Sequence, residues 1–200
     1  MAKNTVAKNM RVVAVARLPT VFGEFNIVAF ENAPDGKEHV ALVKGMVRGK
    51  KRVPVRIHSE CLTGDALGSL KCDCRQQLET ALRELSKRAC GVLIYLRQEG
   101  RGIGLANKIK AYHLQEHGFD TFDANMLLGF ADDLRDYSVA AEMLKLLEVK
   151  SIELLTNNPV KIKNLKKHGV RVVKRIPLKI KSNAFNKKYL NAKKKRGHLL

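Results

Sequence analysis

The chain has 200 residues, of which 45% are hydrophobic and 28% charged, and its formal net charge at pH 7 is +19. This length suits one sizeable domain that buries about 70% of its unfolded surface, so a core can form without disulfides. We expect no membrane segment, because no stretch approaches the roughly 18 apolar residues that span a bilayer, and no secretory signal is recognisable. A cytoplasmic protein is therefore expected.

The first quarter of the chain is expected to form an antiparallel sheet. The alternation of Phe25, Ile27 and Ala29 is typical of a half-buried antiparallel strand. Short turns rich in Gly, Asn, Asp and Pro separate the expected strands. These strands are residues 11–18, 22–30, 39–45 and 53–58.

Helices and strands alternate from about residue 76. Leu78, Leu82 and Leu85 predict a helix over about 76–88, and the apolar run VLIYL predicts a buried strand at 92–96. The next expected helix runs from about Gly104 to His117. Its buried face would hold Leu105, Ile109 and Tyr112, with Gly118 ending the helix.

The last third continues the alternation. A helix over 138–148 would bury Val139, Met143 and Leu146 or Leu147. A strand at 151–155, a short helix that begins at a proline and ends before Gly169, and a strand at 170–173 complete the pattern. Antiparallel strands in the first quarter, followed by alternating helices and strands, predict an α/β fold with a mixed sheet and helices packed on it.

The positive charge is concentrated towards the C-terminus. Residues 154–200 hold 15 of the 38 Lys and Arg residues and none of the 19 Asp and Glu residues. Such a segment could meet nucleic acid, an anionic surface or a polyanionic small molecule, or it could be a solvated basic face. Base-stacking aromatics are scarce in it, since Phe185 and Tyr189 are the only ones. This scarcity argues against nucleic acid as the partner.

Cys61, Cys72 and Cys74 are spaced C-x10-C-x-C. In a reducing compartment, clustered cysteines favour a metal or catalysis over disulfides. Zinc held by three thiolates keeps an open position that holds a water and lowers its pKa towards roughly 7. The alternatives are a four-ligand structural site completed by His58 or Cys90, and thiols without metal. The zinc deaminase signature is incomplete, because HSEC is present but P-C-x-x-C is absent.

A glycine-rich turn between a strand and a helix is the second candidate. Gly100, Gly102 and Gly104 leave backbone amides free to approach an anion at the helix N-terminus. Arginine forks suit phosphates, and Glu99 could accept hydrogen bonds from a guanine edge. A plain connector is the alternative. The charged residues in this stretch are Arg97, Glu99, Arg101 and Lys108.

Two polar segments follow. FADDLRDYS places Asp133 two residues before Arg135, which suggests a general base held next to an arginine, although acids at a helix start commonly act only as caps. LLTNNPVKIK ends a strand at Thr156 and places Lys161 in the next helical turn. Open α/β sheets bind ligands at the carboxyl ends of their strands, so this turn is a candidate binding segment.

Together these segments resemble GTP cyclohydrolase II, the zinc enzyme family that opens riboflavin synthesis. The resemblance runs from about residue 15 to the closing GHLL. It implies one catalytic domain over 1–200, with a basic C-terminal segment at about 176–200, and a homodimer. The motifs that carry it are RIHSECLTGDALGS, KCDC, LRQEGRGIGL, GFDTFDAN, GFADDLRDYS and LLTNNP, in this order.

The resemblance also implies a reaction and its residues. The family converts GTP and water into formate, pyrophosphate and 2,5-diamino-6-(5-phospho-ribosylamino)pyrimidin-4-one, with one zinc per chain and magnesium on the triphosphate. By resemblance, Cys61, Cys72 and Cys74 bind the zinc. The implied catalytic residues are Tyr112, Asp133 and Arg135. The implied GTP-binding residues are Arg56, Ile57, His58, Ser59, Glu60, Gln77, Glu99, Gly100, Arg101, Thr121, Thr156 and Lys161.

The implied role of Arg135 conflicts with its chemistry. The family proposal makes this arginine the nucleophile at the α-phosphorus, yet a guanidinium with a pKa above about 12 is a poor nucleophile. Asp133 could act as its base, or Arg135 could stabilise the transition state while water attacks. Two alternative functions remain open. The protein could be another zinc-dependent nucleotide hydrolase or deaminase, or a basic zinc-containing nucleic-acid-binding protein.

One position departs from the family pattern. The residue after CDC is usually glycine in the family, and here it is Arg75. A side chain at this position could strain the cysteine loop if the backbone has a positive φ. It could instead add a cation near the triphosphate. The resemblance otherwise keeps every motif residue.

Overall fold

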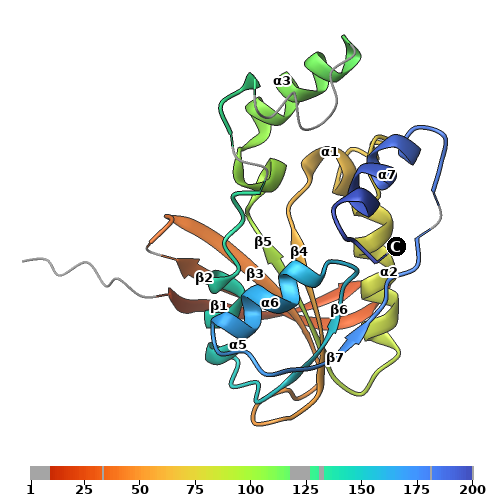
Figure 1. The fold of residues 1–200 in the computed structure, drawn as a ribbon. Helices are drawn as coiled ribbons and strands as arrows, with labels where there is room; N and C mark the ends of the chain where they lie inside the picture. Colours follow the sequence, from red (N-terminus) through yellow and green to blue (C-terminus); the bar gives the residue numbers. More distant parts are fainter. Residues whose placement is uncertain (1–9, 33, 118–126, 131–132, 181, 200) are drawn as a thin grey trace, which may run out of the picture.

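The computed structural model describes residues 10–199 except 33, 118–126, 131–132 and 181. One seven-stranded sheet lies at its centre, in the order β1-β2-β3-β5-β4-β6-β7 (Figure 1). The mixed sheet with packed helices confirms the predicted α/β class. The strands are β1 (Met10–Thr20), β2 (Gly23–Asn32), β3 (Lys37–Lys44), β4 (Val53–Ser59), β5 (Gly91–Leu96), β6 (Ile152–Leu155) and β7 (Val172–Ile176).

The helices alternate with the later strands. They are α1 (Leu62–Asp65), α2 (Cys74–Ser86), the 3-10 helix η1 (Glu99–Gly102), α3 (Leu105–Glu116), α5 (Ser138–Leu146), α6 (Pro159–Lys167) and α7 (Lys187–Lys195). Of the helices that the structure describes, none is both long and apolar enough to cross a bilayer.

The mode of strand pairing changes once across the sheet, from antiparallel to parallel at β5. β1, β2, β3 and β5 pair antiparallel in that order, whereas β5, β4, β6 and β7 pair parallel. Parallel neighbours need a crossover connection, and α2 provides it between β4 and β5, as α6 does between β6 and β7. The carboxyl ends of β4, β5, β6 and β7 therefore lie at one edge of the sheet, where open α/β sheets bind ligands.

Helices cover both faces of the sheet. Val28 and Phe30 of β2 pack in the main core with Met143 of α5, whereas Phe25 packs in a second cluster with Leu85 of α2. β2 is antiparallel to its neighbours, as predicted. The expectation of a half-buried strand was wrong, because α2 and α5 each cover one side.

Most predicted helices are confirmed. α2 buries Leu82 and Leu85, and α5 buries Val139 and Met143. The side chain of Asn158 accepts a hydrogen bond from Val160 N at 2.9 Å and caps α6, with Pro159 in the first helical turn.

The predicted buried face of α3 is wrong. Leu105 and Ile109 are 39% and 47% exposed, and Ala111 is the buried residue of this helix. The physical reason is that α3 packs on η1 and not on the sheet, and Figure 1 shows it projecting beyond the strand ends. Gly118, the expected stop, lies outside the described residues.

The C-terminal part differs from the prediction in two ways. β7 begins at Val172, two residues later than expected. The lysine-rich segment also forms α7, which was not predicted. Figure 1 shows α7 next to the start of α2, and a hydrogen bond between Lys193 Nζ and Asp73 Oδ1 at 2.6 Å joins the two.

Candidate functional site

The polar residues expected at the site gather at the carboxyl edge of the sheet. β4 carries Arg56 and His58, which are 4% and 2% exposed, and Thr156 directly after β6 is 1% exposed. Lys161 reaches back from the first turn of α6, where its Nζ donates to the carbonyl of Ile57 at 3.0 Å. Segments that are up to about a hundred residues apart thus converge on the end of β4.

Three thiols form one cluster beside this edge. The sulfur atoms of Cys61, Cys72 and Cys74 all lie within 4.8 Å of one another, and Cys61 Sγ is 3.7 Å from Cys72 Sγ. Cys61 lies two residues after the end of β4, and Cys74 begins α2. Within the described part of the chain, neither His58 nor Cys90 joins this metal-binding group. The structure thus supports three ligands and gives no support to the four-ligand alternative.

Space beside the thiols is kept free by a glycine. Gly64 in α1 has no Cβ, and a Cβ at this position would lie 2.7 Å from Cys72 Sγ and 3.1 Å from Cys61 Sγ. Thiolates are soft ligands that suit zinc. The donor set and the open space together fit a zinc ion bound by Cys61, Cys72 and Cys74.

Gly64→Ala is expected to lower zinc affinity at least about tenfold, because the new methyl group must displace two of the three sulfurs. Zinc per chain after dialysis against a competing chelator measures the effect. Gly91→Ala is the matched control, since its Cβ would also lie 2.7 Å from a neighbour, but that neighbour is Leu85 in the core. If Gly64→Ala retains zinc as the unsubstituted chain does, the cluster is not the metal site.

The three thiols form hydrogen bonds with one another, and Cys61 also forms one with Lys108. Hydrogen bonds from the Cys72 and Cys74 thiols, together with the Lys108 ammonium, lower the pKa of Cys61. The hydrogen bond to Cys61, with burial and the charge of Cys61 as smaller causes, raises the pKa of Cys72 to about 11. Lys108 Nζ donates to Cys61 Sγ at 3.1 Å and to Glu99 Oε1 at 2.8 Å. A thiolate and an ammonium ion therefore pair inside the cluster.

Glu99 already accepts several hydrogen bonds. Besides Lys108, its carboxylate accepts from Leu62 N at 2.6 Å and from Gly100 N at 2.7 Å, and its side chain is 9% exposed. It therefore ties η1 to α1 and holds Lys108 against Cys61.

His58 points to Asp65 rather than to the thiols. Its Nε2 lies 3.0 Å from Asp65 Oδ2, which also accepts from Cys61 N at 3.1 Å and from the Tyr95 hydroxyl at 2.9 Å. Burial lowers the pKa of His58. The neutral imidazole thus helps to fix the backbone of a thiol residue through a shared carboxylate.

Tyr112 approaches the thiols from α3. Its hydroxyl lies 3.4 Å from Thr63 Oγ1, which lies 3.7 Å from Cys61 Sγ. Burial raises the pKa of Tyr112, so its hydroxyl keeps its proton at neutral pH.

A cation cluster lies around Arg56 of β4. Burial and the charges of its neighbours hold the pKa of Lys161 well below its usual value, and burial lowers the pKa of Arg56 to about 10. Two carboxylates partner this cluster among the described residues, Asp73 with Lys193 and Asp133 with Arg135. Positive charge is in excess, which favours an anionic ligand. The cluster consists of Arg56, Arg101, Arg135, Lys161 and Lys193.

Gln77 links the cation cluster to the cysteine loop. Arg56 Nη2 donates to Gln77 Oε1 at 2.6 Å, and Gln77 Nε2 donates to Asp73, which lies between two of the cysteines. Only the side chain of Gln77 therefore separates a ligand that contacts Arg56 from the cysteine loop.

Several buried polar atoms at this edge have no partner in the described structure: Arg56 Nε, His58 Nδ1, Ser59 Oγ, Gln98 Oε1 and Tyr137 Oη. Buried polar groups are normally hydrogen-bonded, so a group of such atoms at one edge indicates a place for a polar ligand. Glu60 lies next to them and accepts from Arg97 Nε at 3.3 Å.

Asp133 and Arg135 form a close bidentate pair. Arg135 Nε donates to Asp133 Oδ1 at 2.7 Å, and Arg135 Nη2 donates to Oδ2. Burial alone would raise the pKa of Asp133, but the hydrogen bonds and charge of Arg135 outweigh it and lower that pKa. Asp133 in turn raises the pKa of Arg135 against the effect of burial. The pair is ionised, as expected for a carboxylate held beside an arginine.

The glycine-rich turn contacts Leu134, the residue between Asp133 and Arg135. Gly100 and Arg101 both adopt the left-handed region, with φ of 60° and 62°, and Arg101 O accepts from Leu134 N at 3.0 Å. A Cβ on Gly102 would lie 3.0 Å from Leu134 Cβ. The turn therefore fixes Arg101 against the segment that carries Asp133 and Arg135.

Arg75 neither strains the loop nor faces the cation cluster. It lies in the first turn of α2 and is not among the described residues with positive φ. Its Nε donates to Glu79 Oε1 at 3.0 Å, and its side chain is 53% exposed. The expectation of strain is wrong, because Arg75 is part of the helix, and its surface pair with Glu79 gives no support to a role beside the cation cluster.

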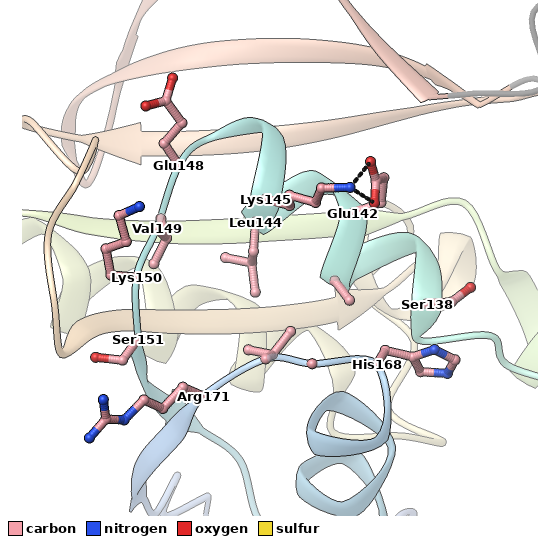
Figure 2. A pocket seen from close by; sticks show the side chains of 13 residues that line it. Ser138, Glu142, Leu144, Lys145, Glu148, Val149, Lys150, Ser151, His168 and Arg171 are labelled. Atoms are coloured by element: carbon pink, nitrogen blue, oxygen red, sulfur yellow. Dashed lines mark hydrogen bonds and ion pairs between the residues drawn. The ribbon is translucent and has the colours of Figure 1, made fainter.

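A separate pocket lies far from these residues. Figure 2 shows it between α5, the turn that leads into β6 and the turn that leads into β7, with His168 and Arg171 on one side and Glu142 and Lys145 on the other. This is the amino edge of the parallel strands, opposite to the thiols. None of the residues expected at the site lines it.

One expected residue could not be placed, and some were missed. Thr121 and the GFDTFDAN motif around it lie outside the described residues. Sequence reasoning missed Gly64, Asp73 and Lys193 as parts of the site. Lys193 had a weak signal, since Tyr189 and Leu190 interrupt the lysines of the C-terminal segment at a spacing that suits a helix.

Comparisons with known proteins point to one family. A family model described as GTP cyclohydrolase II matches residues 10–177. The chain is 57% identical over 192 residues to GTP cyclohydrolase-2 of Histophilus somni (strain 2336), which covers 96% of this chain and 89% of that one. It is 55% identical over 193 residues to GTP cyclohydrolase-2 of Tolumonas auensis, with 96% and 98% covered. Riboflavin biosynthesis protein RibBA of Synechocystis sp. is 55% identical over 189 residues, 34% of its own length.

Proposed function

The chain belongs to the GTP cyclohydrolase II family of riboflavin biosynthesis, and we propose that it hydrolyses GTP to formate, pyrophosphate and 2,5-diamino-6-(5-phospho-ribosylamino)pyrimidin-4-one. One observation carries the proposal: a three-thiol cluster and a cation cluster meet at the carboxyl edge of the sheet, bridged by Gln77 and Asp73. A guanine nucleotide needs both, because its ring must be opened and its triphosphate neutralised.

Cys61, Cys72 and Cys74 would hold one zinc ion per chain. When bound, zinc supplies Lewis acidity, which lowers the pKa of water towards neutrality. Opening the imidazole ring of guanine requires water to add at C8, and the resulting formamide must then be hydrolysed. We assign Tyr112 as the proton donor for these steps, since its protonated hydroxyl lies beside Thr63 at the thiols.

The chain's own residues would bind and orient the nucleotide. Glu60, Ser59 and the backbone at Ile57 would line the guanosine side, next to the unpaired Nδ1 of His58. Arg56, Arg101, Thr156 and Lys161 would contact the triphosphate, which brings magnesium with it as part of the substrate. Gln77, Glu99 and Gly100 would hold the two halves of the site in place.

We propose that Arg135 stabilises charge at the α-phosphorus and does not attack it. Asp133 keeps its guanidinium protonated and fixed by two hydrogen bonds, and a protonated guanidinium has no free electron pair. Water is then the nucleophile, with the Asp133 carboxylate close enough to orient it. Loss of pyrophosphate follows as the cation cluster neutralises the leaving group.

Incubation of the zinc-loaded chain with GTP and magnesium tests the function. Formate and pyrophosphate are expected in equal amounts. Ammonia in place of formate would instead indicate a deaminase, and phosphate in place of pyrophosphate would indicate another nucleotide hydrolase. Salt-dependent binding of DNA or RNA without turnover would favour the nucleic-acid-binding alternative.

We also propose that the 200 residues form one catalytic domain that assembles as a homodimer in the cytoplasm. The free thiols of all four cysteines suit a reducing compartment. The edge strand β1 supports a dimer, because Val12, Val13 and Val15 are 42%, 55% and 62% exposed. Apolar residues along a sheet edge commonly mark an interface.

Light scattering after size exclusion is expected to give a mass of twice 22.4 kDa. Val13→Lys together with Val15→Lys should shift the protein to the monomer, because two buried ammonium ions would oppose association. Val173→Lys on the opposite edge strand β7, where Val173 is 39% exposed, is the control and should leave the mass unchanged. A dimer that survives the β1 substitutions would place the interface elsewhere.

A further inference from the structure

The C-terminal segment after β7 is attached to the site at several points. Asn157, in the turn after β6, accepts from Leu178 N at 3.0 Å through its side chain, and its backbone carbonyl accepts from Leu199 N at 2.8 Å. Asn183 and Asn186 exchange hydrogen bonds of 2.8 Å at the start of α7. Both ends of the segment are thus fixed to the carboxyl edge of the sheet.

Lys193 extends from α7 into the cation cluster. Its Nζ lies 2.6 Å from Asp73 Oδ1 and 4.4 Å from the centre of the Tyr189 ring. The Lys193 side chain is 11% exposed and the Asp73 side chain is fully buried. Burial alone would lower the pKa of Lys193, but Tyr189 and Asp73 outweigh it and raise that pKa. Lys193 is therefore a charged ammonium ion inside the site and not part of a solvated basic face.

This ammonium ion adds to an existing excess of positive charge. Lys193 contributes to the low pKa of Lys161, and with Arg101 and Arg135 it contributes to the pKa of His198, which burial and these charges lower to about 4. Asp73 neutralises one charge, and it also accepts from Gln77. The cations of the cluster outnumber its two carboxylates, Asp73 and Asp133, so a further anion would stabilise them.

We propose that Lys193 is a polyphosphate-binding residue, which α7 carries to the site from beyond the range that the family model matches. The proposal rests on the proposed function, because GTP supplies the polyphosphate. An ammonium group has three N–H donors. One donates to Asp73, and a second faces the Tyr189 ring. One donor remains for a phosphate oxygen next to Arg56 and Lys161.

Binding of two separate probes tests this role without turnover. Inorganic pyrophosphate with magnesium reports on the polyphosphate side, and guanosine reports on the base side. Titration calorimetry on the zinc-loaded chain should show that Lys193→Gln weakens pyrophosphate binding about tenfold, since one charge-assisted hydrogen bond is lost. Guanosine binding and zinc content should not change, and Lys193→Arg should restore most of the pyrophosphate affinity.

Lys194→Gln is the matched control, because Lys194 is the next residue of α7 and is exposed. It should bind pyrophosphate as the unsubstituted chain does. The proposal is overturned if Lys193→Gln keeps full pyrophosphate affinity, if Lys194→Gln loses as much, or if the unsubstituted chain binds no pyrophosphate. It is also overturned if Lys193→Gln loses zinc and binds both probes less well, which would indicate a structural role. The formate assay decides the proposed function separately.

Discussion

Replacing Cys72 by serine is expected to remove the zinc and to lower formate release from GTP by at least about 100-fold. Cys72 Sγ lies 3.7 Å from Cys61 Sγ, and the metal-binding group of the described residues holds no fourth sulfur that could take its place. A serine hydroxyl stays protonated at neutral pH and is a poor ligand for zinc. Metal analysis and formate release measured on the same sample give the result.

Cys90→Ser provides the matched control, because it makes the same chemical change at a cysteine outside the cluster. It should keep both zinc and formate release within about twofold of the unsubstituted chain. A Cys72→Ser protein that retains zinc and makes formate normally would show that the three thiols are not the metal site.

Arg135→Lys is expected to lower the rate of pyrophosphate release by roughly 100-fold. Lysine keeps the positive charge but cannot form the bidentate pair that fixes Arg135 on Asp133. A displaced charge stabilises the transition state less well, since the contribution depends on position. Rapid-quench measurements of pyrophosphate, with formate followed in parallel, resolve the affected step.

Arg75→Lys is the control, because Arg75 is an exposed arginine that pairs with Glu79 at the surface. Its effect should be within about twofold. GTP labelled at the α-phosphorus separates the two mechanisms for Arg135. We expect no label on acid-quenched protein, and a protein-bound label that Arg135→Lys abolishes would instead identify Arg135 as the nucleophile.

The sequence predicted the fold well where apolar spacing is decided by the sheet. The antiparallel strands of the first quarter, the buried run of β5 and the Leu82 and Leu85 face of α2 all follow from packing in or on the sheet. The face of α3 was mispredicted because Leu105 and Ile109 have helical spacing but no sheet beneath them. Periodicity identifies a face and not the partner that covers it.

The sequence predicted the separate segments of the candidate site, but not which of their side chains contact one another. Residue types and short spacings were enough to predict the group of three cysteines and the pair of Asp133 with Arg135. The contact between Lys193 and Asp73 joins residues 120 positions apart, and local patterns contain no information on such a pair. The lysine-rich composition of α7 suggested a solvated face. Composition could not show that this segment is anchored, because the anchoring depends on contacts of Asn157 and Asn186.

A zinc titration of the metal-free chain tests the central claim most directly, namely that Cys61, Cys72 and Cys74 hold one catalytic zinc ion at the GTP site. Formate release from GTP with magnesium is measured after each addition of zinc. We predict that the rate rises linearly and stops rising at one zinc per chain. A rate that is already full without zinc, or that remains zero after one equivalent has bound, would contradict the account.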